Sequence, residues 1–142
     1  MQTATVRWQQ AERFEATTPS GHQLSLDSDR KGNTGPGPME LLLVALGACT
    51  ATDIVIILEK KRQMLESLEV SVSGERAPDP PQVWTRLDVV FHVRGKNPDG
   101  ASIDQKAVAD AVRLSEEKYC SVAAMLRKTA ALTMRYEILP PR

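Results

Sequence analysis

The feature that most constrains the fold is a proline-led run of apolar, helix-forming residues that follows a strongly polar loop. The loop, DSDRKGNTGPGP at residues 27–38, is dense in turn formers and contains no large apolar residue. Pro38 suits the first position of a helix, where its missing N–H costs nothing, and MELLLVALGA follows it. We therefore predict a helix that begins at Pro38 and continues through Cys49 to about Lys61.

The first half of this helix is apolar on every side between Leu41 and Cys49, so we expect protein to surround it. This stretch is well short of the roughly 20 apolar residues of a membrane helix, and we interpret it as a core helix. The amino-terminal MQTATVRWQQ lacks a basic segment followed by an apolar run. It does not resemble a secretory signal, and we expect a cytoplasmic protein.

Composition predicts an ordinary globular chain. The length of 142 residues suits one domain over residues 1–142, and 42% apolar with 25% charged residues is typical of proteins that fold. Lysine plus arginine, 18 in all, balance 18 aspartates and glutamates. No overall field would attract nucleic acid or an anionic membrane, so we expect neither as a partner.

Strand signals surround the helix. Apolar and polar residues alternate around residues 6–8, 14 and 24–26, which predicts an antiparallel hairpin region. Two longer alternating runs, at residues 68–72 and 83–93, flank the turn APDPP. We expect them to form two long paired strands.

The last third predicts two helices and a final strand. Ser102 and Gln105 have the spacing of a capping box, which predicts a helix from there to about Tyr119. A short helix over residues 121–128 and a strand over 132–138 follow. The buried stripe of the first of these helices is predicted to comprise Val108, Ala111, Val112 and Ser115. The element order indicates an α+β fold.

Two cysteines are the candidates for chemistry. Cys49 lies in the apolar half of the long helix, and Cys120 lies where one helix ends and the Ser121 helix begins. They could be two buried, inert residues or a redox pair. The helix start would lower the pKa of Cys120 and favour its thiolate. A thiolate that attacks a peroxide becomes a sulfenic acid, which a second thiol converts to a disulfide.

Such a thiolate needs a cation beside it and a carboxylate that positions the cation. Glu40 is the candidate carboxylate, although taken by itself it is more simply a first-turn glutamate that complements the helix dipole. His22 and His92 do not have the ligand spacing of a zinc site together with the cysteines. GNTGPGP lacks the ending of a phosphate loop. We therefore expect no metal and no bound cofactor.

Two segments carry a resemblance to a known family. GPGPMELLLVALGACTATDIV (residues 35–55) and LSEEKYCSVAAML (residues 114–126) resemble the two cysteine motifs of the OsmC/Ohr family, and they are most similar to its YhfA-like branch. The resemblance implies an OsmC-like fold, with antiparallel sheets wrapped around long central helices in an intertwined homodimer. It also implies an active site at the subunit interface.

The resemblance further implies a thiol-dependent peroxidase that reduces organic hydroperoxides and is regenerated by an external thiol. In this family Cys49 corresponds to the peroxidatic and Cys120 to the resolving cysteine, and we follow that assignment over the helix-start argument. Arg13, with Arg30 as the alternative, would hold the thiolate, and Glu40 would orient the arginine.

One departure concerns the helix start. Met39 stands where the peroxidase branches have glutamate, and Glu40 is one residue later. The alternative function is therefore a non-catalytic protein of the same fold that senses oxidants or binds a small apolar ligand. For a peroxidase, we expect a preference for fatty or aromatic hydroperoxides over hydrogen peroxide, because four apolar residues would line the pocket. These are Leu42, Leu43, Leu46 and Met125.

Overall fold

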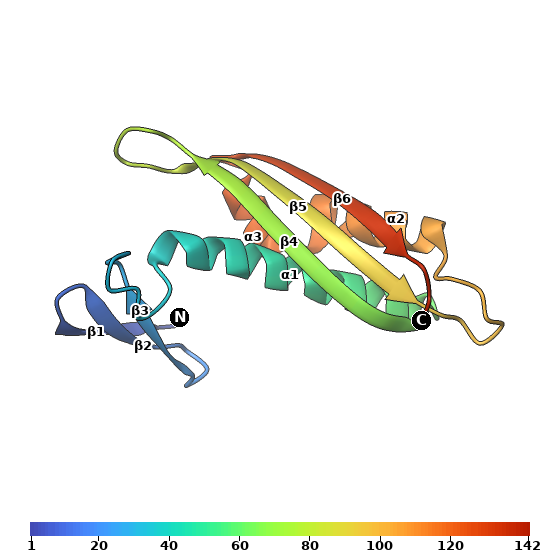
Figure 1. Ribbon diagram of the computed structural model, residues 1–142, viewed down its shortest axis with the longest axis horizontal. Coiled ribbons are helices and arrows are strands. Elements are labelled where there is room, and N and C mark those ends of the chain that lie inside the picture. The colour runs from blue at the N-terminus through green and yellow to red at the C-terminus, as the bar shows by residue number, and fades with distance from the viewer. The chain divides into compact units, whose positions relative to one another are not determined.

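The structure is a computed structural model that describes residues 1–142. It is shown in Figure 1. The chain divides into two compact units, Met1–Leu42 and Leu43–Arg142, and each is described by itself. Both contain a small sheet, and the helices lie mostly in the second. The predicted α+β class is confirmed.

The first unit contains an antiparallel sheet in the order β1-β2-β3. Its strands are β1 (Thr5–Gln10), β2 (Arg13–Thr17) and β3 (Gln23–Asp27). The alternation read from the sequence therefore located all three strands.

The polar loop after β3 is organised by Asp27, whose side chain is almost fully buried. Its carboxylate accepts the Thr34 hydroxyl at 2.6 Å, and the backbone N–H groups of Asp29 and Thr34 at 2.9 and 3.1 Å. Arg13 adds an ion pair at 3.7 Å. These hydrogen bonds, the Thr34 hydroxyl first, lower the pKa of Asp27 to about 2. The loop is thus built around one carboxylate.

Helix α1 (Pro38–Lys60) begins at the predicted proline. The Gly37 N–H donates to Glu40 Oε1 at 2.7 Å, so the glutamate closes the first turn in the manner of a capping box. The helix is long and apolar enough to span a membrane by length and composition. Within the chain it is a core helix on one face, where five residues are buried: Leu46, Thr50, Ile54, Ile57 and Leu58.

The second unit is built on a sheet in the order β4-β5-β6. Strands β4 (Leu65–Arg76) and β5 (Trp84–Gly95) are antiparallel, whereas β6 (Ala131–Leu139) pairs with β5 in parallel. The sheet is therefore mixed, while antiparallel sheets were predicted. The helices of this unit pack on one sheet face (Figure 1), which alternates along β5 as Leu87, Val89, Phe91 and Val93.

The helical segment before β6 differs in detail from its prediction. Helix α2 (Gln105–Leu114) is capped by Asp104, whose carboxylate accepts the Ala107 N–H at 3.0 Å, and Ser102 instead pairs with Lys96 in a β-bridge. The Ser102 capping box was therefore wrong. The predicted stripe is buried. A π-helical turn, η1 (Ser115–Tyr119), then leads to α3 (Ser121–Leu126).

The prediction that protein surrounds α1 is not met within one chain. Val44, Val55 and Ile56 are large apolar residues of this helix, yet 64%, 44% and 44% of their surfaces are exposed. Because the buried residues occupy a single face, large apolar side chains on the other faces stay substantially exposed within one chain.

Candidate redox site

The structure brings Cys49 and Cys120 together. Cys49 lies in the middle of α1 and is half-buried, and Cys120 lies between η1 and α3 and is buried. Both are free thiols, and both belong to the same packed core, where each influences the pKa of the other. The fold thus brings two cysteines that are 71 positions apart in the sequence into one site.

The first turn of α3 surrounds the Cys49 sulfur with donors. The Ser121 hydroxyl lies 4.0 Å from the sulfur. Burial alone would raise the pKa of Cys49, but hydrogen bonds from the Val122 N–H, the Cys120 thiol and the Ser121 hydroxyl outweigh it. The net effect lowers the pKa of Cys49, so the thiolate is favoured here.

Cys120 has the opposite character. Its sulfur caps α3 and accepts the Ala123 N–H at 3.3 Å. Burial is the largest influence, and with the neighbouring Cys49 it raises the pKa of Cys120 to about 11. The prediction that the helix start makes Cys120 the more acidic thiol was wrong. The cap hydrogen bond exists, but it does not compensate for the loss of solvent around a 3% exposed side chain.

Asp53 lies one helical turn after Cys49, on the same side of α1. Its carboxylate accepts the Ser115 hydroxyl at 2.8 Å, which ties α1 to η1. The π-helical turn is closed by the Cys120 N–H, which donates to the Ser115 carbonyl at 3.0 Å. The Asp53 charge also raises the pKa of both thiols, as a minor influence beside burial. Sequence reasoning missed Asp53, although a carboxylate four residues after a candidate cysteine in an apolar helix is a detectable signal.

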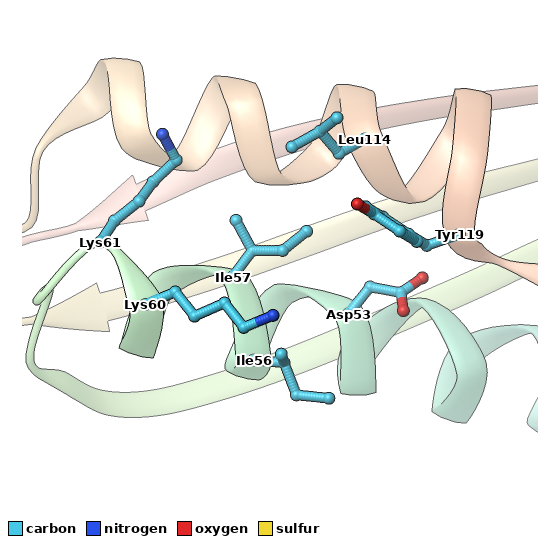
Figure 2. A pocket seen from close by; sticks show the side chains of 7 residues that line it. All are labelled: Asp53, Ile56, Ile57, Lys60, Lys61, Leu114 and Tyr119. Carbon is cyan, nitrogen blue, oxygen red and sulfur yellow. The ribbon is translucent and has the colours of Figure 1, made fainter.

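A pocket of about 370 Å³ lies between the second half of α1 and the α2–η1 segment. Figure 2 shows its seven lining residues. They are Asp53, Ile56, Ile57, Lys60, Lys61, Leu114 and Tyr119. None of the four apolar residues predicted for a pocket is among them. Leu46 is fully buried in the core, while 72% of the Met125 surface is exposed.

Glu40 has an arginine partner, but it is not Arg13. The Arg30 guanidinium donates to Glu40 Oε1 at 3.2 Å and to the Gly35 carbonyl at 2.9 Å, whereas Arg13 pairs with Asp27. The prediction that Glu40 orients Arg13 was therefore wrong, and the alternative, Arg30, is the one that Glu40 contacts. The dipole interpretation also holds, because Glu40 closes the first turn of α1.

The two histidines contact other groups and not the cysteines. His22 Nδ1 lies 2.9 Å from the Ser20 hydroxyl in the first unit, and His92 Nε2 lies 3.4 Å from Glu137 on the second sheet. No group of three or more histidine, cysteine or carboxylate side chains has an arrangement that could hold a metal.

Comparisons with known proteins agree with this architecture. The family model described as OsmC-like protein matches residues 30–135. The protein YhfA of Escherichia coli strain K12 is 40% identical over 136 residues, which cover 96% of this chain and 97% of the relative.

Two crystal structures show the same fold at lower identity. An OsmC-like protein from Mycoplasma pneumoniae superposes with a TM-score of 0.81 at 15% identity, covering 98% of this chain and 97% of that one. The organic hydroperoxide resistance protein OhrB of Bacillus subtilis gives 0.63 at 17% identity, covering 95% and 98%. With a family model matched over most of its length and a relative as similar as YhfA, the chain belongs to the OsmC-like protein family.

Proposed function

We propose that this protein is a thiol-dependent peroxidase that reduces organic hydroperoxides, with Cys49 as the attacking thiol and Cys120 as the resolving one. The observation that carries the proposal is that the Cys49 sulfur lies against the first turn of α3, the turn that Cys120 caps. The pKa values of the two thiols are shifted in opposite directions. The lowered pKa favours the thiolate of Cys49, which makes Cys49 the nucleophile. The raised pKa keeps Cys120 protonated in the resting protein, before it attacks the sulfenic sulfur. The family membership and the fold shared with OhrB support a redox role.

The proposed cycle balances as follows. The Cys49 thiolate attacks one peroxide oxygen, an S–O bond forms, the O–O bond breaks, and the alkoxide takes up a proton to leave as an alcohol. Cys120 then attacks the sulfenic sulfur, and a disulfide forms as water leaves. An external thiol supplies the two electrons that reduce the disulfide. Two free thiols at rest suit a cytoplasmic setting, which is part of the proposal.

We assign the cation of the proposed mechanism to Arg30 in place of Arg13. Four acceptors hold the Arg30 guanidinium: the Asp27 and Gly35 carbonyls, Asn33 Oδ1 and Glu40 Oε1. A guanidinium fixed in this way loses little freedom when it binds an anion. Arg30→Lys keeps the positive charge but loses the planar set of N–H donors of the guanidinium, so we expect this variant to turn over more slowly. We expect Arg13→Lys to have a smaller effect.

The proposed assembly is a homodimer with the active site at the subunit interface. Its support is a stripe of exposed apolar or small side chains along one side of α1. The stripe consists of Val44, Ala48, Thr52 and Val55. Successive members are four, four and three positions apart, so they lie on the same side of the helix. A second copy of this helix would bury the stripe, which explains why α1 is apolar beyond its core-facing side.

A thiol count tests the proposal. One equivalent of cumene hydroperoxide should remove both free thiols of the reduced wild type within seconds, and a dithiol should restore them. Cys120→Ser should stop at a sulfenic acid on Cys49, detectable with a dimedone-type reagent. Cys49→Ser should keep Cys120 reduced. A wild type whose thiols survive the hydroperoxide would refute the proposal.

A second candidate is a non-catalytic protein of the same fold. Met39 at the expected glutamate position and a well-formed apolar pocket favour it. It predicts thiols that persist in hydroperoxide while a small apolar ligand binds. The thiol count therefore separates the two functions, and a comparison of cumene hydroperoxide with hydrogen peroxide tests the expected substrate preference.

A further inference from the structure

Asp53 opposes the thiolate that the proposed function requires. It lies one helical turn after Cys49 on α1, and its negative charge raises the pKa of Cys49 and of Cys120. A carboxylate at this position therefore works against attack by Cys49. Any benefit that it brings to the site must come from its contacts.

The contacts of Asp53 lead to Cys120 through a single residue. Ser115 is fully buried, and its hydroxyl donates to Asp53 Oδ2 at 2.8 Å. The carbonyl of the same serine accepts the Cys120 N–H at 3.0 Å. Two consecutive hydrogen bonds therefore connect a side chain of α1 to the backbone of Cys120. Figure 2 shows the Asp53 carboxylate directed from α1 toward the segment that contains Tyr119.

The second of these hydrogen bonds depends on the π-helical form of η1. In an α-helix the Ser115 carbonyl would accept the N–H of Tyr119, four residues later. In η1 the donor lies five residues later and is Cys120. Single π-helical turns are rare and occur frequently at functional sites. Here the turn gives Cys120 the hydrogen bond that leads back to α1.

Cys120 thus lies between two contacts with α1. Asp53 holds Ser115, five residues before Cys120, and the Cys49 sulfur lies 4.0 Å from the hydroxyl of Ser121, one residue after it. The Ser121 contact is long. The Ser115 hydrogen bond is short and has a carboxylate as its acceptor, which makes it the stronger of the two.

We propose that Asp53 is a positioning residue for the disulfide step, because through Ser115 it holds Cys120 within reach of the Cys49 sulfur. In that step the Cys120 sulfur bonds to the sulfenic sulfur of Cys49, the S–O bond breaks, and the oxygen leaves as water with the proton of Cys120. The inference rests on the proposed function for its place in the cycle. The pairing of the two thiols can be measured without a hydroperoxide.

Equilibration with reduced and oxidised glutathione, read by mass after acid quenching, measures how readily the thiols pair. One oxidised glutathione converts the dithiol to the disulfide and becomes two reduced molecules. Asp53→Ala should shift this equilibrium toward the dithiol by roughly tenfold, the effect of one lost hydrogen bond to a charged acceptor. Asp53→Asn also removes the charge, but its amide oxygen can still accept the Ser115 hydroxyl, so it should stay close to the wild type. Asp79→Ala, in an exposed turn, is the control and should change nothing.

Two further readouts separate positioning from a general loss of packing. Ser115→Ala should match Asp53→Ala, and the double variant should be no worse than either single change, because both remove the same hydrogen bond. In a Cys120→Ser background, the pH dependence of iodoacetamide alkylation should show the pKa of Cys49 lowered alike by Asp53→Ala and Asp53→Asn, because both remove the charge. Equal glutathione equilibria for Asp53→Ala and Asp53→Asn, or additive effects of Asp53→Ala and Ser115→Ala, would overturn the proposal.

The two proposals can fail separately, because the glutathione equilibrium involves no hydroperoxide. The expected shift in Asp53→Ala, with wild-type thiols inert to cumene hydroperoxide, would support the positioning role and refute the peroxidase. Rapid loss of both thiols to cumene hydroperoxide, with a glutathione equilibrium that Asp53→Ala leaves unchanged, would do the reverse.

Discussion

The Ser121 hydroxyl lies 4.0 Å from the Cys49 sulfur, although 72 residues separate the two in the sequence. The contact places the first turn of α3 against the middle of α1. As a result, this short helix interacts with both cysteine sulfurs, but in different ways. It donates to Cys49, which is half-buried, and it is capped by Cys120, which is buried. The difference in acidity between the thiols follows from burial and from donors, and not from helix position alone.

Removal of the Ser121 hydroxyl should raise the pKa of Cys49. Ser121→Ala deletes one of three donors that lower the pKa of Cys49, so the thiolate loses part of its stabilisation and the pKa should rise. The pH dependence of iodoacetamide alkylation, measured in a Cys120→Ser background, reports the change. Ser73→Ala, on the exposed face of β4, is the matched control and should leave the profile unmoved. An unshifted profile for Ser121→Ala would show that the hydroxyl does not act on the sulfur.

Cys120 should make the protein sensitive to alkali. Its pKa is about 11 in the folded protein against 9.0 for an ordinary thiol, so the unfolded chain loses the proton first as the pH rises. Its contribution to stability is complete below pH 9.0 and is lost as the pH rises toward about 11. Urea unfolding under reducing conditions should show a smaller alkaline loss for Cys120→Ser than for the wild type. Identical pH dependences would contradict the assignment.

Asp27 should act at the opposite end of the pH scale. Its pKa falls from 3.8 to about 2 on folding, so it stabilises the folded chain above pH 3.8, and this contribution is lost as the pH falls through about 2. Asp27→Asn should be less stable than the wild type at neutral pH and should lose less stability in acid. Asp79→Asn, in an exposed turn, serves as the control. Equal acid responses of wild type and Asp27→Asn would contradict this role.

Local patterns in the sequence predicted most of the fold. Pro38 began the helix as expected, and the alternation along β5 identified the buried face, because both depend on near neighbours in the chain. The Ser102 capping box failed because Asp104, two residues on, offers a carboxylate to the same turn. The parallel pairing of β6 has no local signature, since the direction of a strand depends on the path of the chain before it.

The site was less predictable because its contacts cross the fold. That Cys49 meets Cys120 could be inferred only from the family resemblance. The donors from Ser121 and Val122 depend on how α3 approaches α1, and the partner of Glu40 depends on a loop whose path Asp27 determines.

Charge placed on the exposed stripe of α1 distinguishes a dimer from a lone chain. Val44 is 64% exposed within one chain, so Val44→Asp should hardly affect a monomer. In the proposed dimer the same aspartate would be buried without a partner, which costs several kcal/mol, and the protein should dissociate or become much less stable. Sedimentation velocity at several concentrations measures the outcome. Met64→Asp changes a residue that is 54% exposed outside the stripe and should preserve the assembly. If the wild type sediments as a monomer, or if Val44→Asp remains a stable dimer, the stripe is not the interface and α1 must present its apolar residues for another reason.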